Sequence, residues 1–239
     1  SEELVTVRNG FYDSVNNTII FDQTTDSSLR ELRPGDRQSL GFTIKPDPAI
    51  SQSPDISFVV NTTARRVADR SAAESLVGDA TRTIRFASQA SLLASVSHVS
   101  GPVPPVAERL SQYQISIRVD SGGNELTGGR LETRLPGYVT WLDVTDGDGQ
   151  IEFNPTSRNL VWNVGDFDNN STKQTSFTVG LLPSISQVGQ TPTLIFDQRF
   201  TATDKFTGLP ISATVRELDT ELSREAGYQA NNGEVQRTE

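Results

Sequence analysis

The sequence of 239 residues contains no cysteine and no methionine, and its only histidine is His98. Without cysteine the chain has no disulfide, no thiol nucleophile and no thiolate ligand for a metal. One histidine alone does not make the converging ligand set of a common metal site. No Gly-x-Ser-x-Gly string marks a nucleophilic serine that His98 would activate. We therefore interpret His98 as a surface or edge-strand residue and expect the protein not to be an enzyme.

Long hydrophobic runs are also absent. None approaches the roughly 18 residues of a transmembrane helix, and hydrophobic residues make up only 34% of the chain. The formal net charge of −9 disfavours binding to nucleic acid or to anionic lipid. We expect no nucleic-acid partner and no membrane contact by this segment. Among extracellular proteins, the lack of cysteine favours a bacterial one, because secreted eukaryotic β-domains of this size often carry a disulfide.

The chain does contain short runs in which apolar and polar residues alternate, such as Leu40–Ile44 and Gln112–Val119. Alternation with a period of two predicts a β-strand with one buried face. Turn-forming strings such as Ser121-Gly122-Gly123-Asn124 separate these runs. Many short strands at this spacing predict an all-β protein made of antiparallel, immunoglobulin-like sandwiches.

The chain also repeats itself. Phe42-Thr43-Ile44 returns as Phe177-Thr178-Val179, at an offset of 177 − 42 = 135 residues. Thr18–Phe21 matches Asn159–Trp162, at an offset of 159 − 18 = 141 residues. The offset changes between blocks, as expected of strands that are joined by loops of different lengths. Repetition at a domain-sized period predicts tandem modules.

The repeat predicts three segments. Residues 87–217 match a complete immunoglobulin-like module, whereas residues 1–86 match only the C-terminal part of one, so the first sandwich is incomplete at its N-terminus. An incomplete sheet exposes unpaired backbone groups. We expect them to be covered either by residues that precede Ser1 or by strands from another chain, a neighbouring module or a copy of the same protein. Residues 218–239 form a tail that we expect either to be disordered or to supply a strand to another module.

Several strings carry a resemblance to known proteins. They are Val5–Asp13, Asn16–Asp22, Gly101–Pro105, Leu135–Leu142, Phe153–Pro155, Leu160–Asp166, Ser186–Gly189 and Thr203–Gly208. Together they resemble the "conserved repeat" Ig-like domain family of large surface proteins from small-genome, candidate-phylum bacteria. The resemblance implies tandem Ig-like modules on an exported, envelope-attached chain, with residues 101–217 as the last module of the array. It supplies no catalytic residues, and Phe21 stands where a Trp is more usual.

One acidic loop suggests a metal site. Asp143, Asp146, Asp148 and Glu152 lie close together in the sequence, and carboxylates are the ligands that calcium prefers. The helix–loop–helix calcium template nevertheless fails here, because its two anchoring positions would fall on Val144 and Pro155. Asp-Gly pairs are also ordinary hairpin turns. Both interpretations stay open: a structural turn, and a weak calcium site formed by the four carboxylates.

Aromatic residues also allow two interpretations. Packing between two sheets is the one we favour, and stacking on a carbohydrate is the alternative. The residues concerned fall on strand-like runs: Trp141, Trp162, Phe177, Phe196 and Phe200.

These observations predict a non-catalytic structural or adhesive module of a bacterial extracellular or cell-surface protein. Head-to-tail or strand-exchange contacts would assemble it into filaments. The expected partners are neighbouring modules, copies of the same protein, and the surface of a host or neighbouring cell. The alternative is a calcium- or carbohydrate-binding surface module, and calcium is then the one cofactor we would expect.

Overall fold

The computed structural model describes residues 5–45, 55–66, 75–222 and 232–238. The described chain consists of β-strands and their connections, with two short 3-10 turns at Ser27–Leu29 and Ile185–Gln187. The prediction of an all-β protein is thus confirmed. The chain divides into two units, Ser1–Ser53 and Pro54–Glu239.

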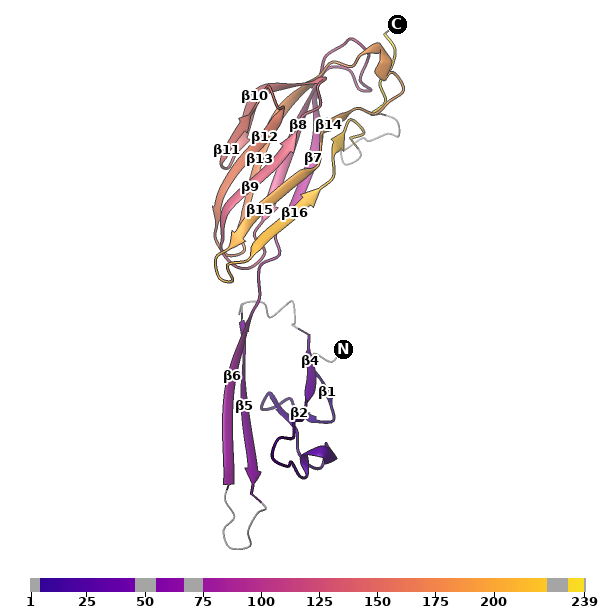
Figure 1. The fold of residues 1–239 in the computed structure, drawn as a ribbon. Helices are drawn as coiled ribbons and strands as arrows, with labels where there is room; N and C mark the ends of the chain where they lie inside the picture. The colour runs from indigo at the N-terminus through magenta and orange to yellow at the C-terminus, as the bar shows by residue number, and fades with distance from the viewer. Residues whose placement is uncertain (1–4, 46–54, 67–74, 223–231, 239) are drawn as a thin grey trace. The chain divides into compact units, whose positions relative to one another are not determined.

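The larger unit contains a sandwich of two antiparallel sheets (Figure 1). One sheet has the strand order β10–β13–β8–β7, and the other has the order β11–β12–β9–β15–β16. The antiparallel sandwich predicted from the alternating runs is therefore confirmed. Its strands are β7 (Ser91–Ser100), β8 (Ser111–Asp120), β9 (Leu126–Arg134), β10 (Val139–Gly147), β11 (Gln150–Phe153), β12 (Asn159–Phe167), β13 (Thr172–Leu181), β15 (Gln198–Asp204) and β16 (Pro210–Val215).

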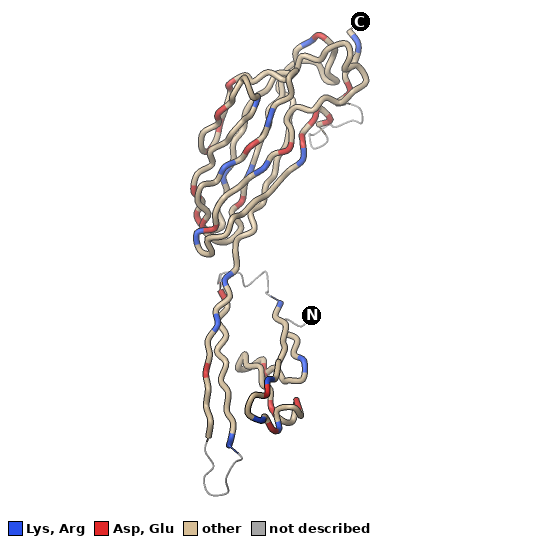
Figure 2. The backbone as a smooth tube through the Cα atoms, in the orientation of Figure 1, with Lys and Arg blue, Asp and Glu red and all other residues tan. Residues whose placement is uncertain are grey.

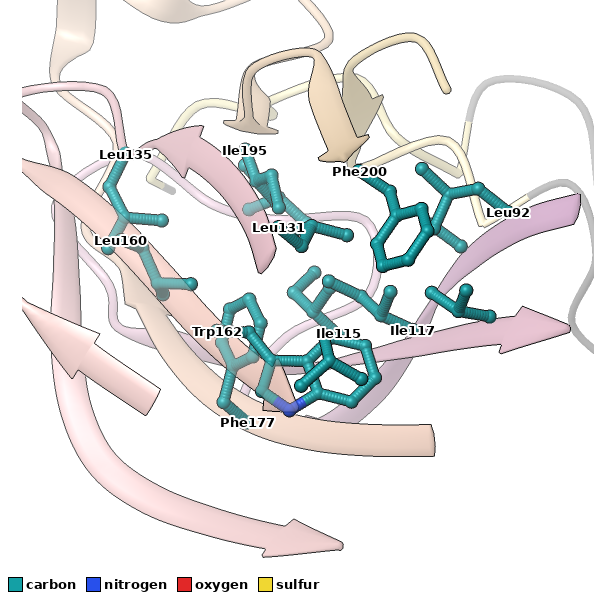
Figure 3. Close-up of a cluster of buried hydrophobic side chains, with 14 of the residues drawn as sticks. Leu92, Ile115, Ile117, Leu131, Leu135, Leu160, Trp162, Phe177, Ile195 and Phe200 are labelled. Carbon is teal, nitrogen blue, oxygen red and sulfur yellow. The ribbon is translucent and has the colours of Figure 1, made fainter. Parts of the chain in front are cut away.

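The core lies between these sheets and follows the alternation of the sequence. Every second side chain of β8, from Tyr113 to Val119, is at most 1% exposed. Trp162, Phe177 and Phe200 reach the core from three other strands and are buried as well (Figure 3). Truncating a large buried aromatic side chain typically costs about 3–5 kcal/mol. These three rings therefore pack the core, as we interpreted them, and do not offer a stacking surface.

The described parts of the tail belong to the sandwich. β17 (Leu218–Asp219) pairs with β14 (Thr193–Ile195), and Leu222 and Val235 are 4% and 1% exposed. The backbone N–H of Gln236 donates to the carbonyl of Pro105 at 2.8 Å. The sequence suggested a disordered segment or a strand for another module. The described residues instead find their partners in the module that precedes them, through contacts that are too distant in the sequence to be predicted.

The sandwich has two distinct ends. At the linker end, Ser88 meets the loop that follows β8 and Asp204, the last residue of β15. At the tail end, the connections that follow β7 and β13 meet residues 232–238. β7 runs from the linker end to the tail end, and Figure 1 shows the C-terminal residues at the end away from its start. At about 3.3 Å per residue, a strand of this length spans roughly 33 Å.

The remaining strands form three separate two-stranded sheets. β1 (Val5–Arg8) pairs with β4 (Gly41–Ile44), and β2 (Phe11–Asp13) pairs with β3 (Thr18–Ile20); both pairs lie in the smaller unit. β5 (Asp55–Arg65) and β6 (Ser75–Arg85) form a long hairpin in the larger unit, ahead of the sandwich.

The repeat in the sequence is also a repeat in local structure at the hairpin β2–β3. Tyr12 faces Ile19 in this hairpin, and Phe153 faces Leu160 in β11–β12. Both members of the pair are displaced by the same 141 residues, since 153 − 12 and 160 − 19 are equal. The two hairpins therefore share one register.

The turns of these two hairpins are also built alike. In the first, the Asp13 side chain accepts hydrogen bonds from two backbone N–H groups, and in the second the Asn154 side chain does the same. Each turn ends on a residue with positive φ, 50° at Asn17 and 60° at Arg158. An Asx side chain that satisfies backbone donors is a common way of stabilising a tight turn.

Candidate functional sites

The acidic loop lies on one sandwich edge, on β10, on the turn after it and on β11. A carboxylate oxygen of Asp148 accepts the backbone N–H of Gln174 at 2.9 Å. Glu152 accepts the side-chain amide of Asn163 at 3.2 Å, and Asp143 accepts the indole N–H of Trp141 at 3.3 Å. These carboxylates are thus engaged with neighbouring protein donors.

Asp146 enters this loop through its backbone, because its carbonyl accepts the hydroxyl of Thr175 at 3.1 Å. Among the residues that the structure describes, no three acidic or histidine side chains form a group able to hold a metal ion. The four predicted ligands, Asp143, Asp146, Asp148 and Glu152, are therefore not brought together as a cage. The calcium site stays a prediction, and a thermal melt with and without millimolar calcium tests it.

The backbone of this loop supports the structural interpretation. Gly147 and Gly149 have φ values of 117° and 73°, a region that residues with a side chain rarely adopt. A Cβ on Gly149 would lie 2.4 Å from the carbonyl oxygen of Asn163. The indole N–H of Trp162 donates to the carbonyl of Asp148 at 2.6 Å, which ties the turn to the core. The Asp-Gly-Asp-Gly string thus forms a tight connection between two strands.

Asp166 also has a structural role. It accepts the Thr127 hydroxyl at 2.8 Å and the Gly128 N–H at 3.1 Å, and these hydrogen bonds lower the pKa of its carboxyl group. Lys205 lies 3.4 Å from Asp166 and 3.3 Å from Glu125. All these groups are substantially exposed, so the ion pairs add little stability.

His98 is half-buried on β7, the edge strand of its sheet. Its ring meets the Tyr113 ring edge-on, with 5.9 Å between centroids and an interplanar angle of 74°. Tyr113 is fully buried in β8. This position agrees with the edge-strand interpretation of His98 from the sequence.

The linker end holds a buried polar network that the sequence did not indicate. The carboxylate of Asp204 accepts the backbone N–H of Ser88 at 2.7 Å, the side-chain amide of Asn124 at 2.8 Å and the backbone N–H of Thr207 at 2.8 Å. The Asn124 amide also donates to the carbonyl of Phe86 at 2.9 Å. Three connections of the sandwich therefore converge on one carboxylate.

This network strongly favours the charged form of Asp204. Burial acts to raise the pKa of Asp204, but the hydrogen bonds from Ser88, Asn124 and Thr207 outweigh it, so the pKa lies well below the ordinary value of an aspartate. Asp204 thereby fastens the chain where it enters the sandwich.

Charged side chains of both signs are interspersed along the strands of the sandwich (Figure 2). A shallow groove on the outer face of one sheet is lined by residues that include Arg130, Glu132, Arg134, Phe196 and Glu217. The guanidinium group of Arg134 lies over the Phe196 ring, 4.9 Å from its centroid. One face of this ring is therefore occupied by a protein group, which lessens its value for stacking on a sugar.

Within the described part of the chain, no helix has the length and apolar character needed to cross a membrane. No protein-family model matches the sequence. No match is found among the curated proteins either.

Several solved structures show a distant likeness. BcpA, the major pilin subunit of Bacillus cereus, matches with 9% identity and a TM-score of 0.35, over 55% of this chain and 39% of that one. Two domains of the major pilin SpaD from Corynebacterium diphtheriae match with 14% identity and a TM-score of 0.36, over 54% of this chain and 52% of theirs. An exo-β-N-acetylglucosaminidase from Vibrio harveyi matches with 11% identity and a TM-score of 0.32, over 52% and 17%.

In all three cases the matched part is less than two thirds of the compared structure. Similarity at this level carries no information about activity, and it includes both pilins and a glycosidase. The fold assignment therefore rests on the strands and their pairing in this chain.

Proposed function

We propose that this chain is a non-catalytic structural or adhesive segment of a bacterial extracellular or cell-surface protein. In this role the sandwich acts as a spacer along its long axis. The observation that carries the proposal is the position of the two ends. The chain enters at the linker end beside Ser88, and the described C-terminal residues lie at the tail end.

Both ends are fastened to the sandwich. Asp204 holds the incoming chain. At the tail end, Val235 is buried and Thr220 donates its hydroxyl to the carbonyl of Gly233 at 2.7 Å. A pull on the two ends is therefore transmitted into the strands instead of unravelling a loose terminus.

The repeat supports assembly with similar units. Partners of this kind are neighbouring modules or copies of the same protein, joined head to tail or by exchange of strands into filaments. The resemblance to Ig-like repeats of bacterial surface proteins supports the same location and partners, and the surface of a host or neighbouring cell is a further partner of an adhesive module.

The absence of cysteine makes the location directly testable. Ser212→Cys places one thiol on an exposed position of β16, and Ser111→Cys places one at a fully buried position of β8. A maleimide that does not cross membranes is added to intact cells of the organism that makes the protein. We expect it to label the Ser212→Cys variant and to leave the Ser111→Cys variant unlabelled until the protein is unfolded. Labelling of Ser212→Cys only after lysis would contradict a surface location.

A further inference from the structure

A slot at the tail end of the sandwich holds residues 233–238 as an added strand. Its walls are residues 105–107, which follow β7, and residues 188–190, which follow β13; together they are called the tail slot. The segment forms a parallel bridge with each wall. Its main-chain hydrogen bonds, all between 2.8 and 2.9 Å, run from Val235 N–H to the Gln190 carbonyl, from Gly189 N–H to the Val235 carbonyl, from Gln236 N–H to the Pro105 carbonyl and from Ala107 N–H to the Gln236 carbonyl. Main-chain bonds of this kind are typical of an extended peptide bound by strand addition.

Three side-chain positions of the segment are also matched to the slot and to the residues beside it. At Gly233 an added Cβ would lie 2.6 Å from the Cα of Glu221, so this position favours glycine. Val235 is 1% exposed. The hydroxyl of Thr238 donates to the carbonyl of Ala107 at 2.6 Å. The tail slot therefore fits an extended segment with the pattern Gly-x-Val-x-x-Thr.

The contacts in the tail slot are separate from the main core. Ala107 and Val235 are each 1% exposed, yet neither belongs to the cluster of buried side chains between the two sheets. The segment therefore leaves the slot without opening that cluster. Regions with few buried apolar contacts open locally, at a smaller free energy than global unfolding. Exchange of this segment thus leaves the sandwich itself folded.

We propose that the tail slot takes residues 233–238 of a second copy, so that two copies exchange these segments. A second copy is the partner because it carries Gly233, Val235 and Thr238 at the spacing that the slot fits, and the pattern occurs once in the sequence. The exchanged form makes the same contacts as the single chain, which is a low-cost route to a dimer. This inference rests on the exchange of strands in the proposed function, and it names the exchanged segment and its acceptor.

The place of the slot determines how two copies are joined. The segment and the tail slot both lie at the tail end, so the exchange joins tail end to tail end and does not involve the linker ends. Two reciprocal exchanges complete a closed pair with two-fold symmetry. A tethered segment has an effective concentration in the millimolar range. Single chains therefore prevail in dilute solution, and exchange is favoured where copies are held close together.

The test uses thiol–disulfide exchange between two variants of the full chain, which has no cysteine of its own. The acceptor carries Val106→Cys together with Val235→Asp, which displaces its own segment from the slot. The donor carries Gln236→Cys, activated as a mixed disulfide with thionitrobenzoate. Val106 and Gln236 are bridge partners, and the spacing of neighbouring strands lies within the Cα–Cα range of a disulfide. Attack by the acceptor thiolate forms the interchain disulfide and releases thionitrobenzoate, which is followed by its absorbance.

A second donor gives the matched control. It carries the same activated thiol as Ser212→Cys, at an exposed position of β16. At equal concentrations we expect the Gln236→Cys donor to release thionitrobenzoate at least about 10-fold faster, because the bound segment holds its sulfur beside the acceptor thiol. A chain that carries both Val106→Cys and Gln236→Cys should form the disulfide within itself, which checks the geometry of the pair.

Equal rates for the two donors would overturn the proposal. Tryptophan fluorescence checks that the acceptor is folded. A second acceptor carries Gln236→Pro in place of Val235→Asp, which removes the N–H that the Pro105 carbonyl accepts, and should give the same preference between donors. The thiol labelling of cells tests location and does not involve the tail slot, so failure of either experiment leaves the other conclusion standing.

Discussion

Phe42 and Phe177 occupy matching positions of the repeat, yet the Phe42 side chain is 44% exposed and the Phe177 side chain is 1% exposed. Phe42 lies on β4, which pairs with β1, and Phe177 lies on β13, which pairs with β10. Both β1 and β10 begin with the Val-Thr string of the repeat. Phe177 also faces Ile115 of β8 on its other side. No strand in the described residues takes the position of β8 beside β4. The difference in burial therefore follows from the set of neighbouring strands.

This difference in burial should appear in the free energy of unfolding that is lost when each side chain is truncated. Phe177→Ala is expected to destabilise the sandwich by about 3–5 kcal/mol, the usual range for a buried phenylalanine. Both tryptophans, Trp141 and Trp162, lie in the sandwich, so denaturant unfolding followed by tryptophan fluorescence reports on this module. Phe42→Ala is the control, and it should leave the midpoint of this unfolding transition unchanged. Equal shifts for both variants would contradict the separation of the two units.

The Asp204 network should make stability depend on pH. The pKa of Asp204 is lowered in the folded state, so its contribution is fully present above the ordinary aspartate pKa near 4 and is lost as the pH falls below it. Asp204→Asn is expected to cost about 2 kcal/mol at neutral pH, because hydrogen bonds to a charged group are replaced by weaker ones. Urea unfolding at pH 7 and pH 3 should show that the gap between the wild type and the variant narrows in acid.

Asp143→Asn is a suitable control for this experiment, since Asp143 is exposed on the β10 bulge. Its variant should unfold like the wild type at both pH values. A gap for Asp204→Asn that stays constant between pH 7 and pH 3 would show that the charge of Asp204 is not what stabilises the linker end.

Gly149 should tolerate no side chain. Gly149→Ala would place a Cβ 2.4 Å from the Asn163 carbonyl oxygen, at a φ of 73°, and is expected to cost about 1–3 kcal/mol through backbone strain. Gly137→Ala has no atom within 4 Å of the added Cβ and should change stability little. Thermal unfolding of the two variants compares them directly. If Gly149→Ala unfolds at the wild-type temperature, the backbone of this turn does not require glycine at position 149.

The tail should contribute to the stability of the sandwich. Val235→Ala removes two methyl groups from a side chain that is 1% exposed, so we expect it to cost about 1–3 kcal/mol. Val144→Ala makes the same change at a side chain that is 61% exposed and should have almost no effect. If both variants unfold at the wild-type midpoint, the tail does not pack as the structure shows.

The parts of the fold that could be predicted are those encoded locally. Alternation in β8 places Tyr113, Ile115, Ile117 and Val119 in the core. The repeated hairpins share one register because an Asp or Asn side chain accepts backbone N–H groups in both turns. A period of two is a property of each strand by itself.

The remaining parts depend on contacts between distant residues. Asp204 meets Ser88 and Asn124 across separations of 116 and 80 residues, and neither partner carries a recognisable motif. The burial of Val235 depends on loops that belong to other parts of the chain. The calcium interpretation relied on carboxylates that are close in the sequence, whereas the hydrogen-bond donors to Asp143, Asp148 and Glu152 come from three different strands, β10, β13 and β12.

The central claim, that the sandwich acts as a spacer loaded end to end, is tested most directly by single-molecule force measurements. Because the chain has no cysteine, handles attach only at introduced thiols. Gln89→Cys with Arg237→Cys pulls on opposite ends of the sandwich, and Gln89→Cys with Leu209→Cys pulls on two points at the linker end. Forced unfolding reports the barrier along the direction of pulling. We expect the higher unfolding force for the opposite-end pair at equal pulling speed, and an equal or lower force for that pair would contradict a spacer that carries load along its axis.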